Sequence, residues 1–350
     1  TVRRQPVKSR VLEDSVYKLI ARADLLRAAI VFAILLLALN EPSADAIWLL
    51  AGLAFLLGSA EVLRDNAAQT ILPSIVDKKD LEVANGQLWG TEQLTGQFIG
   101  PPLAGVLIAT GIAVPFGIDV AMLVIAAGLV WLITLPEQMR VPQSFIKALL
   151  EGITFMRGDR DLLRLAIVLG FANFIATATI TVQVLFAQDV LGLSAASYGM
   201  ILSVAACGAI TGSLLAPRLT RMFGVQMCLY LSIAAWVIGY GSIGLNETAI
   251  VMPIALFVVM AGSMLWNVIT VSWRQRRIPS ALLGRVNSIY RFFGWGSMPL
   301  GALAGGLIVA LFEDEWGREM ALRAPFVLAS GACVLLLIYA MCKLRLSGAE

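Results

Sequence analysis

The feature that most constrains this chain is a succession of apolar segments, each near the roughly 20 residues that a helix needs to cross a bilayer. Because the backbone must satisfy its own hydrogen bonds in lipid, each span is expected to be an α-helix. Charged residues make up 14% of the chain, too few for a soluble domain, where about 25% is usual. We predict ten spans, over residues 23–40, 46–72, 84–110, 112–136, 161–186, 197–217, 224–245, 248–273, 284–312 and 321–343.

Lys and Arg alternate between successive loops, and this alternation predicts which side of the membrane each loop faces. The segment 1–22 is rich in both, the loop 40–45 has neither, and the next loop carries Lys78 and Lys79. By the positive-inside rule, segment 1–22 and both termini are expected in the cytoplasm. The net charge of +3 comes from these loops, so no nucleic-acid partner is expected.

The span 84–110 carries an unusual set of glycines and prolines. Gly96 and Gly100 are four residues apart, so they share a helix face on which another helix could approach closely. Pro101 and Pro102 remove two backbone donors and should bend the span. A bent, closely packed helix suits a part that moves against another, although ordinary membrane packing would use the same residues.

The spacing Gly96-x-x-x-Gly100-Pro101-x-x-x-Gly105 resembles the antiporter signature in the fifth transmembrane helix of Major Facilitator Superfamily exporters. The flanking text is similar to the branch of enterobactin-exporter-like and macrolide-efflux-like proteins. It reads Ala60-Glu61-x-x-Arg64-Asp65-Asn66-Ala67-Ala68-Gln69, then Leu72-Pro73, then Leu81-x-x-Ala84-Asn85-Gly86. The resemblance covers nearly the whole chain from Ala23 onward.

This resemblance implies an all-α polytopic membrane protein of two helical bundles, with substrate bound between them. It also implies proton-coupled export of a small organic molecule, such as a drug-like compound or a siderophore, by alternating access. The expected setting is the plasma or inner membrane, with a monomer that needs no cofactor. Two rivals stay open: a lysophospholipid or nutrient carrier of the same fold, and a non-transporting remnant.

An internal repeat supports the two-bundle layout. Asn85 matches Asn287, and Leu103-Ala104-Gly105 matches Leu303-Ala304-Gly305, at an offset of about 200 residues. The second half holds six predicted spans over 161–345, whereas 23–136 holds four. Members of the superfamily have twelve spans, so we expect the first two to be missing from the N-terminal bundle. An incomplete sequence and a real truncation would both explain this.

Residues 137–160 are expected to link the bundles along the cytoplasmic membrane surface. Phe145, Leu149, Ile153 and Met156 recur at helical spacing with charged residues around them, which predicts an amphipathic helix. A membrane-targeting role is the alternative.

Ionisable residues inside spans are costly in lipid, so each is a functional candidate. Glu61, Arg64 and Asp65 in the second span and Glu92 in the third are expected at similar depth, toward the cytoplasm. We predict that Arg64 pairs with Glu61 or Glu92. The cluster could be a static lock of the cytoplasmic gate or the group that loads and releases the coupled proton. Asp119 is a further candidate, although its place after Pro115 also suits a helix-start residue.

Neutral polar and aromatic residues within the spans could line a central cavity for a bulky, amphiphilic substrate. The same Thr and Asn side chains could instead serve as hydrogen bonds between helices. The candidates are Gln93, Gln97, Asn173, Phe174, Thr177, Gln183, Trp266 and Asn267.

No constellation for catalysis or metal binding stands out. The chain has no histidine, which removes the usual proton carrier and the commonest metal ligand. Its four cysteines lie in apolar stretches without ligand spacing. We therefore expect neither an enzyme nor a metal site, and the partners expected are a small-molecule substrate, protons and the lipid bilayer.

Overall fold

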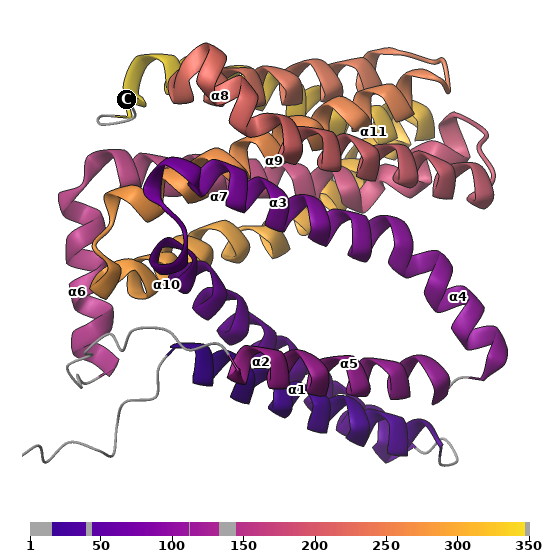
Figure 1. Cartoon of the computed structure of the whole chain (residues 1–350). Helices are drawn as coiled ribbons and strands as arrows, with labels where there is room; N and C mark the ends of the chain where they lie inside the picture. Colours follow the sequence, from indigo (N-terminus) through magenta and orange to yellow (C-terminus); the bar gives the residue numbers. More distant parts are fainter. Residues whose placement is uncertain (1–15, 40–43, 112, 133–144, 347–350) are drawn as a thin grey trace, which may run out of the picture. The chain divides into compact units, whose positions relative to one another are not determined.

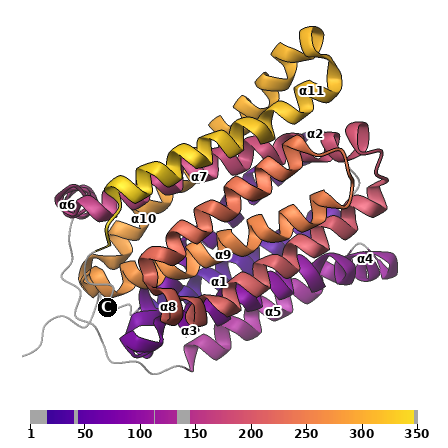
Figure 2. The ribbon, with the colours of Figure 1, turned by 90° about the horizontal axis from the view of Figure 1, so that it is seen from above.

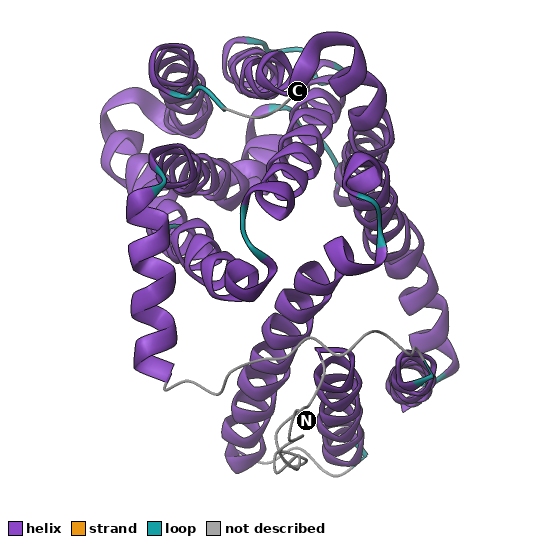
Figure 3. Cartoon of the chain, turned by 60° about the vertical axis from the view of Figure 1, so that its left-hand side comes forward, coloured by secondary structure: helices purple, strands orange, loops and turns teal. Residues whose placement is uncertain are grey.

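The structure is a computed structural model that describes residues 16–39, 44–111, 113–132 and 145–346. Within these ranges every regular element is a helix (Figure 3), which confirms the all-α class expected from the apolar segments. The contacts divide the chain into two units. The first takes in Thr1–Ile75, Pro102–Leu150 and Ser280–Gly284, and the second takes in Val76–Pro101, Glu151–Pro279 and Arg285–Glu350. The expected division into bundles 23–136 and 161–345 stays a prediction.

The first unit is built on α1 (Val16–Ala38), which packs against α2 (Ala44–Ile75) and α5 (Ala113–Trp131) (Figure 1). Ala28 and Val31 of α1 meet Leu123 of α5 in a small buried core, with Leu57 of α2 at its edge. Large apolar side chains elsewhere on these helices, such as Trp48, are exposed. Apolar residues on the outside suit helices that face lipid rather than water.

The glycine-proline span is a helix with a change of register in its middle. It consists of α3 (Leu81–Gln93), the π-helical turn η2 (Leu94–Ile99) and α4 (Gly100–Thr110), and a short 3₁₀ turn, η1 (Lys78–Asp80), precedes it. In η2 the Gly100 N–H bonds to the Thr95 carbonyl, five residues back instead of four. Because Pro101 and Pro102 cannot donate to the preceding turn, the wider turn lets the helix continue past them.

The second unit contains most of α6 (Phe145–Gly158), then α7 (Arg160–Leu185) with the π-helical turn η3 (Phe186–Val190), α8 (Ala195–Leu245), α9 (Val251–Arg277), most of α10 (Ser280–Gly296) and α11 (Met298–Lys343). Both α8 and α11 comprise two helices joined at one glycine. Gly224 and Gly317 have φ values of 78° and 77°, which a residue with a Cβ rarely adopts. The expected span 284–312 is divided at Ser297, just before Pro299.

Close backbone contacts hold the second unit together. In two views α11 lies beside α7 (Figures 1 and 2), and α8 packs against α9. A Cβ added to Gly301 or Gly305 of α11 would lie 2.2 Å from the carbonyl oxygen of Phe174 or Ala178 in α7. Only glycine fits at such a contact, as in other close membrane helix pairs.

The helix expected within 137–160 is present as α6, and its second half packs on α10. Glu151 pairs with Arg285, and a Cβ at Gly152 would lie 2.8 Å from the Ile289 side chain. Ile146 and Leu150 are exposed. Residues 137–144 lie outside the described part, and a place on the membrane surface stays a prediction for α6.

Five described helical segments are long and apolar enough to cross a membrane: Ala113–Trp131, Arg160–Val190, Ala196–Leu245, Val251–Arg277 and Ser280–Lys343. The third and fifth contain 50 and 64 residues, well beyond the roughly 20 that one crossing needs. A multi-pass membrane protein is thereby supported, and the count of ten crossings stays a prediction.

Candidate functional site

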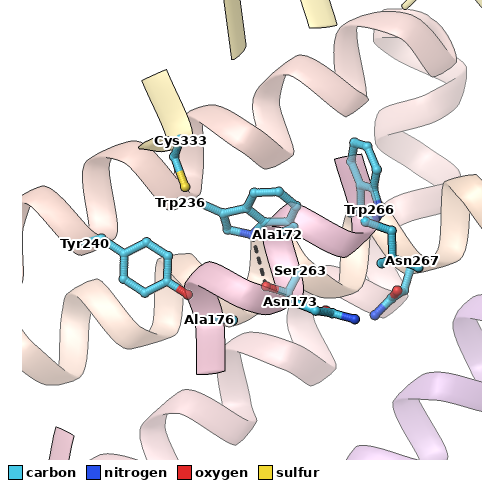
Figure 4. Close-up of a pocket in the computed structure, with 10 residues that line it drawn as sticks. Ala172, Asn173, Ala176, Trp236, Tyr240, Ser263, Trp266, Asn267 and Cys333 are labelled. Carbon is cyan, nitrogen blue, oxygen red and sulfur yellow. Dashed lines mark hydrogen bonds between the residues drawn. The ribbon is translucent and has the colours of Figure 1, made fainter. Parts of the chain in front are cut away.

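A small pocket of about 50 Å³ lies inside the second unit, between α7, α8, α9 and α11 (Figure 4). Its wall combines aromatic, amide and hydroxyl groups with small apolar side chains. The lining residues are Leu169, Ala172, Asn173, Ala176, Trp236, Tyr240, Ser263, Trp266, Asn267 and Cys333.

Hydrogen bonds and ring contacts fix the aromatic side of the pocket. The Trp236 Nε1–H donates to Ser263 Oγ at 3.0 Å, and the Ser263 hydroxyl donates to the Val259 carbonyl. The ring centroids of Trp236 and Trp266 are 5.6 Å apart, a separation typical of stabilising aromatic pairs. These bonds hold the indoles in place without using the amides across the pocket.

The amide side consists of Asn173 on α7 and Asn267 on α9, which point toward one another (Figure 4). Asn173 also donates to the Gly294 carbonyl at 3.0 Å, which anchors it to α10. A wall of this kind can hold a molecule with an apolar body and a few hydrogen-bonding groups. Sites for drug-sized ligands usually measure about 300–1,000 Å³, so this pocket would hold only part of such a molecule.

Three of the eight predicted cavity residues, Asn173, Trp266 and Asn267, line this pocket. Sequence reasoning missed Trp236, Tyr240 and Ser263. Their signal was helical spacing, because Trp236 and Tyr240 lie four residues apart in an apolar span, as do Ser263 and Asn267.

The other five predicted cavity residues lie elsewhere. Phe174 packs its backbone on Gly301, the Thr177 hydroxyl donates to the Asn173 carbonyl, and Gln183 donates to the Tyr198 hydroxyl. Gln93 ends α3, and the side chain of Gln97 lies outside the described part. Substrate binding by any of the eight stays a prediction.

A cluster of five charges joins α1 to α2 in the first unit. Its centre is Asp24, whose carboxylate is buried, with the residue 1% exposed. Asp24 Oδ1 lies 3.2 Å from Arg27 Nη1 and 3.7 Å from Arg64 Nε. Glu61 lies 3.9 Å from Arg27, and Asp65 lies 3.4 Å from Arg64. Two guanidinium groups therefore share one buried carboxylate.

This cluster corrects the expected pairing of Arg64. Among the described residues, Arg64 pairs with Asp24 and Asp65, whereas Glu61 pairs with Arg27. The reason is burial, since a carboxylate removed from water needs cationic partners more than the exposed Glu61 does. Asp24 was missed because it lies at the first residues of the expected span 23–40, where a charged residue is ordinary. A pair between Arg64 and Glu92, which lies on α3, stays a prediction.

Asp119 lies in the second turn of α5, because this helix begins at Ala113. The interpretation of Asp119 as a helix-start residue is therefore wrong. Its side chain is exposed, and a role in coupling stays a prediction.

Close approaches to another helix are found on α3 at Gly86 and Gly90, and the one expected at Gly96 and Gly100 stays a prediction. A Cβ at Gly86 would lie 2.5 Å from the Ser213 carbonyl oxygen of α8, and one at Gly90 would lie 2.9 Å from Ser213 Oγ. Among the described residues nothing lies within 4 Å of a Cβ at Gly96, and Gly100 meets only Thr95 of its own turn. The contact face of α3 ends before η2 changes the helix register. The side chains of Pro101 and Pro102 and the surroundings of Gly105 lie outside the described part.

Polar contacts also tie α3 to α9. Glu82 pairs with Arg276. The fully buried Asn85 donates to Ser272 Oγ at 3.0 Å and to Gln275 Oε1 at 2.7 Å. Sequence reasoning used Asn85 as a mark of the family resemblance and of the internal repeat, whereas the structure gives it a role in joining helices.

Comparisons with known proteins agree on the fold. The sequence model of the Major Facilitator Superfamily matches residues 21–301. The chain is 28% identical over 277 residues to the Enterobactin exporter EntS of Shigella flexneri, covering 77% of this chain and 63% of that relative. It therefore spans less than two thirds of the relative's length.

Solved structures give the same result. A bacterial homologue of the iron transporter ferroportin, in an outward-facing state, matches with a TM-score of 0.68 and 17% identity, covering 93% of this chain and 84% of the other. The human organic anion transporter MFSD10 matches with a TM-score of 0.72 and 17% identity, covering 92% and 79%. Identities this low support the helical fold and nothing finer.

Proposed function

Because the chain belongs to the Major Facilitator Superfamily, we propose that it is a secondary transporter that exports a small organic molecule by alternating access, driven by inward proton flow. Its similarity to a protein named as an enterobactin exporter favours a siderophore or a drug-like compound as cargo. The observation that carries the proposal is the aromatic and amide pocket among α7, α8, α9 and α11. The setting is the inner membrane, with both termini in the cytoplasm and the protein acting as a monomer.

Asp24 is the residue to which we assign proton coupling. Its carboxylate is buried between Arg27 and Arg64, and its second oxygen, Oδ2, has no hydrogen-bond partner. A proton on this carboxylate would remove the negative charge that holds both guanidinium groups, and so loosen α1 from α2. Loading and release of that proton would then favour different conformations. The rival role, a static lock between the two helices, uses the same contacts.

Contacts of α3 with α8 and α9 supply a second element of the mechanism. The Glu82–Arg276 pair and the hydrogen bonds of Asn85 hold these helices together in this conformation. Alternating access requires helices with more than one stable arrangement. We propose that these polar contacts of Glu82 and Asn85 form in one conformation of the transport cycle and break in another.

The test is proton movement in proteoliposomes that contain an internal pH dye. The purified protein would be challenged with enterobactin, with a macrolide and with a cationic dye. We expect at least one compound to drive proton movement, and Asp24→Asn to abolish that movement while still binding the compound. Asp77→Asn is the matched control, because Asp77 is exposed and pairs only loosely with Lys79 at 3.9 Å.

Two results would contradict these assignments. Proton movement that survives Asp24→Asn would leave the transporter intact and reduce the cluster to a lock. Silence with every compound, from protein that is monodisperse and folded, would contradict export itself.

A further inference from the structure

Arg274, in the last turn of α9, is a buried cation that has no anionic partner in the part of the chain that the structure describes. The residue is 4% exposed. Its Nε donates to the Thr270 carbonyl at 3.2 Å, and its guanidinium carbon lies 3.7 Å from the centroid of the Tyr290 ring. Nη1 is buried and has no hydrogen-bond partner. Among the ion pairs formed by described residues, none includes Arg274.

The neighbouring arginines make the contrast clear. Arg276 pairs with Glu82, Arg277 with Asp159, and Arg285 with Glu151. A guanidinium keeps its charge at every physiological pH, so Arg274 cannot escape the cost of burial by losing a proton. A buried charge is normally paired, and the face of one tyrosine compensates only part of that cost. The site is therefore built for an anion that is not part of its surroundings.

A polar stripe on α9 connects this cation to the pocket. Ser263, Asn267, Thr270 and Arg274 follow at intervals of four, three and four residues, which places them on one helix face. Ser263 and Asn267 line the pocket. At 1.5 Å per residue, Arg274 lies about 10 Å further along the helix axis than Asn267. The rest of α9 before Arg274 is mostly apolar, so this face is the polar path along it.

We propose that Arg274 binds an acidic group of the transported molecule while its apolar body occupies the pocket, so that the cargo is an organic anion. This inference rests on the proposed function and deepens it. The pocket is too small for a whole drug-sized molecule, and a site that extends about 10 Å along α9 resolves that mismatch. A guanidinium with a free Nη1 forms charge-assisted bonds to a carboxylate, whereas a neutral amide of the same shape gains little from it.

The test compares radiolabelled salicylate with radiolabelled salicylamide, which differ chiefly in charge, by equilibrium dialysis against the purified protein. We expect salicylate to bind about tenfold more tightly than salicylamide. Arg274→Gln should abolish that preference, and Arg274→Lys, which keeps the charge without the planar fork, should retain part of it. Arg277→Gln is the matched control, because that arginine is on the same turn but is exposed and already paired.

Equal binding of the two probes by the wild type would overturn the proposal, as would a salicylate preference that survives Arg274→Gln. Absence of salicylate binding would also overturn it, since an organic anion would then not be recognised at this site. If Arg274→Gln fails to fold, the wild-type preference and its reduction in Arg274→Lys still decide. If the wild type transports compounds without a preference for anions, only the proposed anion site is contradicted. If the wild type transports none of the compounds, the proposed function is contradicted as well.

Discussion

The two stretches that share the repeated sequence pattern, 81–109 and 283–310, begin alike and then make different contacts. Each carries an asparagine that is buried at a corresponding position, Asn85 in α3 and Asn287 in α10. Each also changes its helical course midway, at η2 in the first stretch and at Ser297 in the second. Their tight glycine contacts differ. The second stretch has tight contacts both before its break, at Gly294, and after it, at Gly301 and Gly305, whereas the first has them only before its break among the described residues, at Gly86 and Gly90.

In this repeat, the sequence pattern therefore predicts where a helix is interrupted better than it predicts which helix face contacts a neighbouring helix. The glycines at 301 and 305 meet α7, which the chain contains. A Cβ added at Gly96 of the first stretch would meet no atom of another helix within 4 Å among the described residues. Which glycine becomes critical thus depends on the neighbouring helix.

The largest effect is expected at Gly305. A Cβ there would lie 2.2 Å from the Ala178 carbonyl oxygen and 3.0 Å from its Cα, so α7 and α11 would have to separate. We expect Gly305→Ala to lower the free energy of unfolding by roughly 3 kcal/mol, at the upper end for overpacking. Thermal unfolding in detergent measures this loss. Gly306→Ala is the control, because open space surrounds Gly306, and equal losses in both variants would contradict the contact.

A smaller effect is expected at Gly86. Only one atom, the Ser213 carbonyl oxygen at 2.5 Å, lies closer than 3 Å to the added Cβ. Gly86→Ala should therefore cost roughly 2 kcal/mol of stability. The same unfolding measurement applies. Gly90→Ala should cost less, because its nearest atom is the Ser213 hydroxyl, which can rotate away. If Gly90→Ala lost more stability than Gly86→Ala, the contact between α3 and α8 described above would be contradicted.

The smallest effect is expected at Gly96. With no neighbour among the described residues, Gly96→Ala should leave stability unchanged or raise it by up to about 1 kcal/mol through better helix propensity. Thermal unfolding of Gly86→Ala and Gly96→Ala in the same detergent measures this difference. If Gly96→Ala destabilised the protein as much as Gly86→Ala, the open space found around Gly96 among the described residues would be contradicted. The two halves of the repeat would then pack alike after all.

Much of the fold could be predicted from the sequence, because hydrophobic length alone sets where a membrane helix begins and ends. The span expected at 161–186 is found as α7 with η3, and the span expected at 248–273 is found within α9. The turn at Gly224 falls where the gap between two predicted spans ends. The linker helix α6 followed from the spacing of its apolar residues.

Contacts between helices could not be predicted in the same way. Asp24 looks like an ordinary residue at the start of a span until α2 brings Arg64 to it. Arg274 looks like one more basic residue at a helix end until its burial beside Tyr290 is seen. The π-helical turn η2 was not expected from the sequence, because the backbone adjusts its register before the prolines and no side-chain pattern encodes that adjustment.

The charge cluster around Asp24 also has a consequence for how this protein can evolve. Arg27 and Arg64 each contact two acidic residues, so loss of any one member leaves its partners with an unbalanced charge around the buried Asp24. Change at one position should therefore be followed by change at another. Among descendants of this sequence, a lineage that replaces Arg27 with a neutral residue should also neutralise Glu61, and Asp24 should be the last of the five to vary.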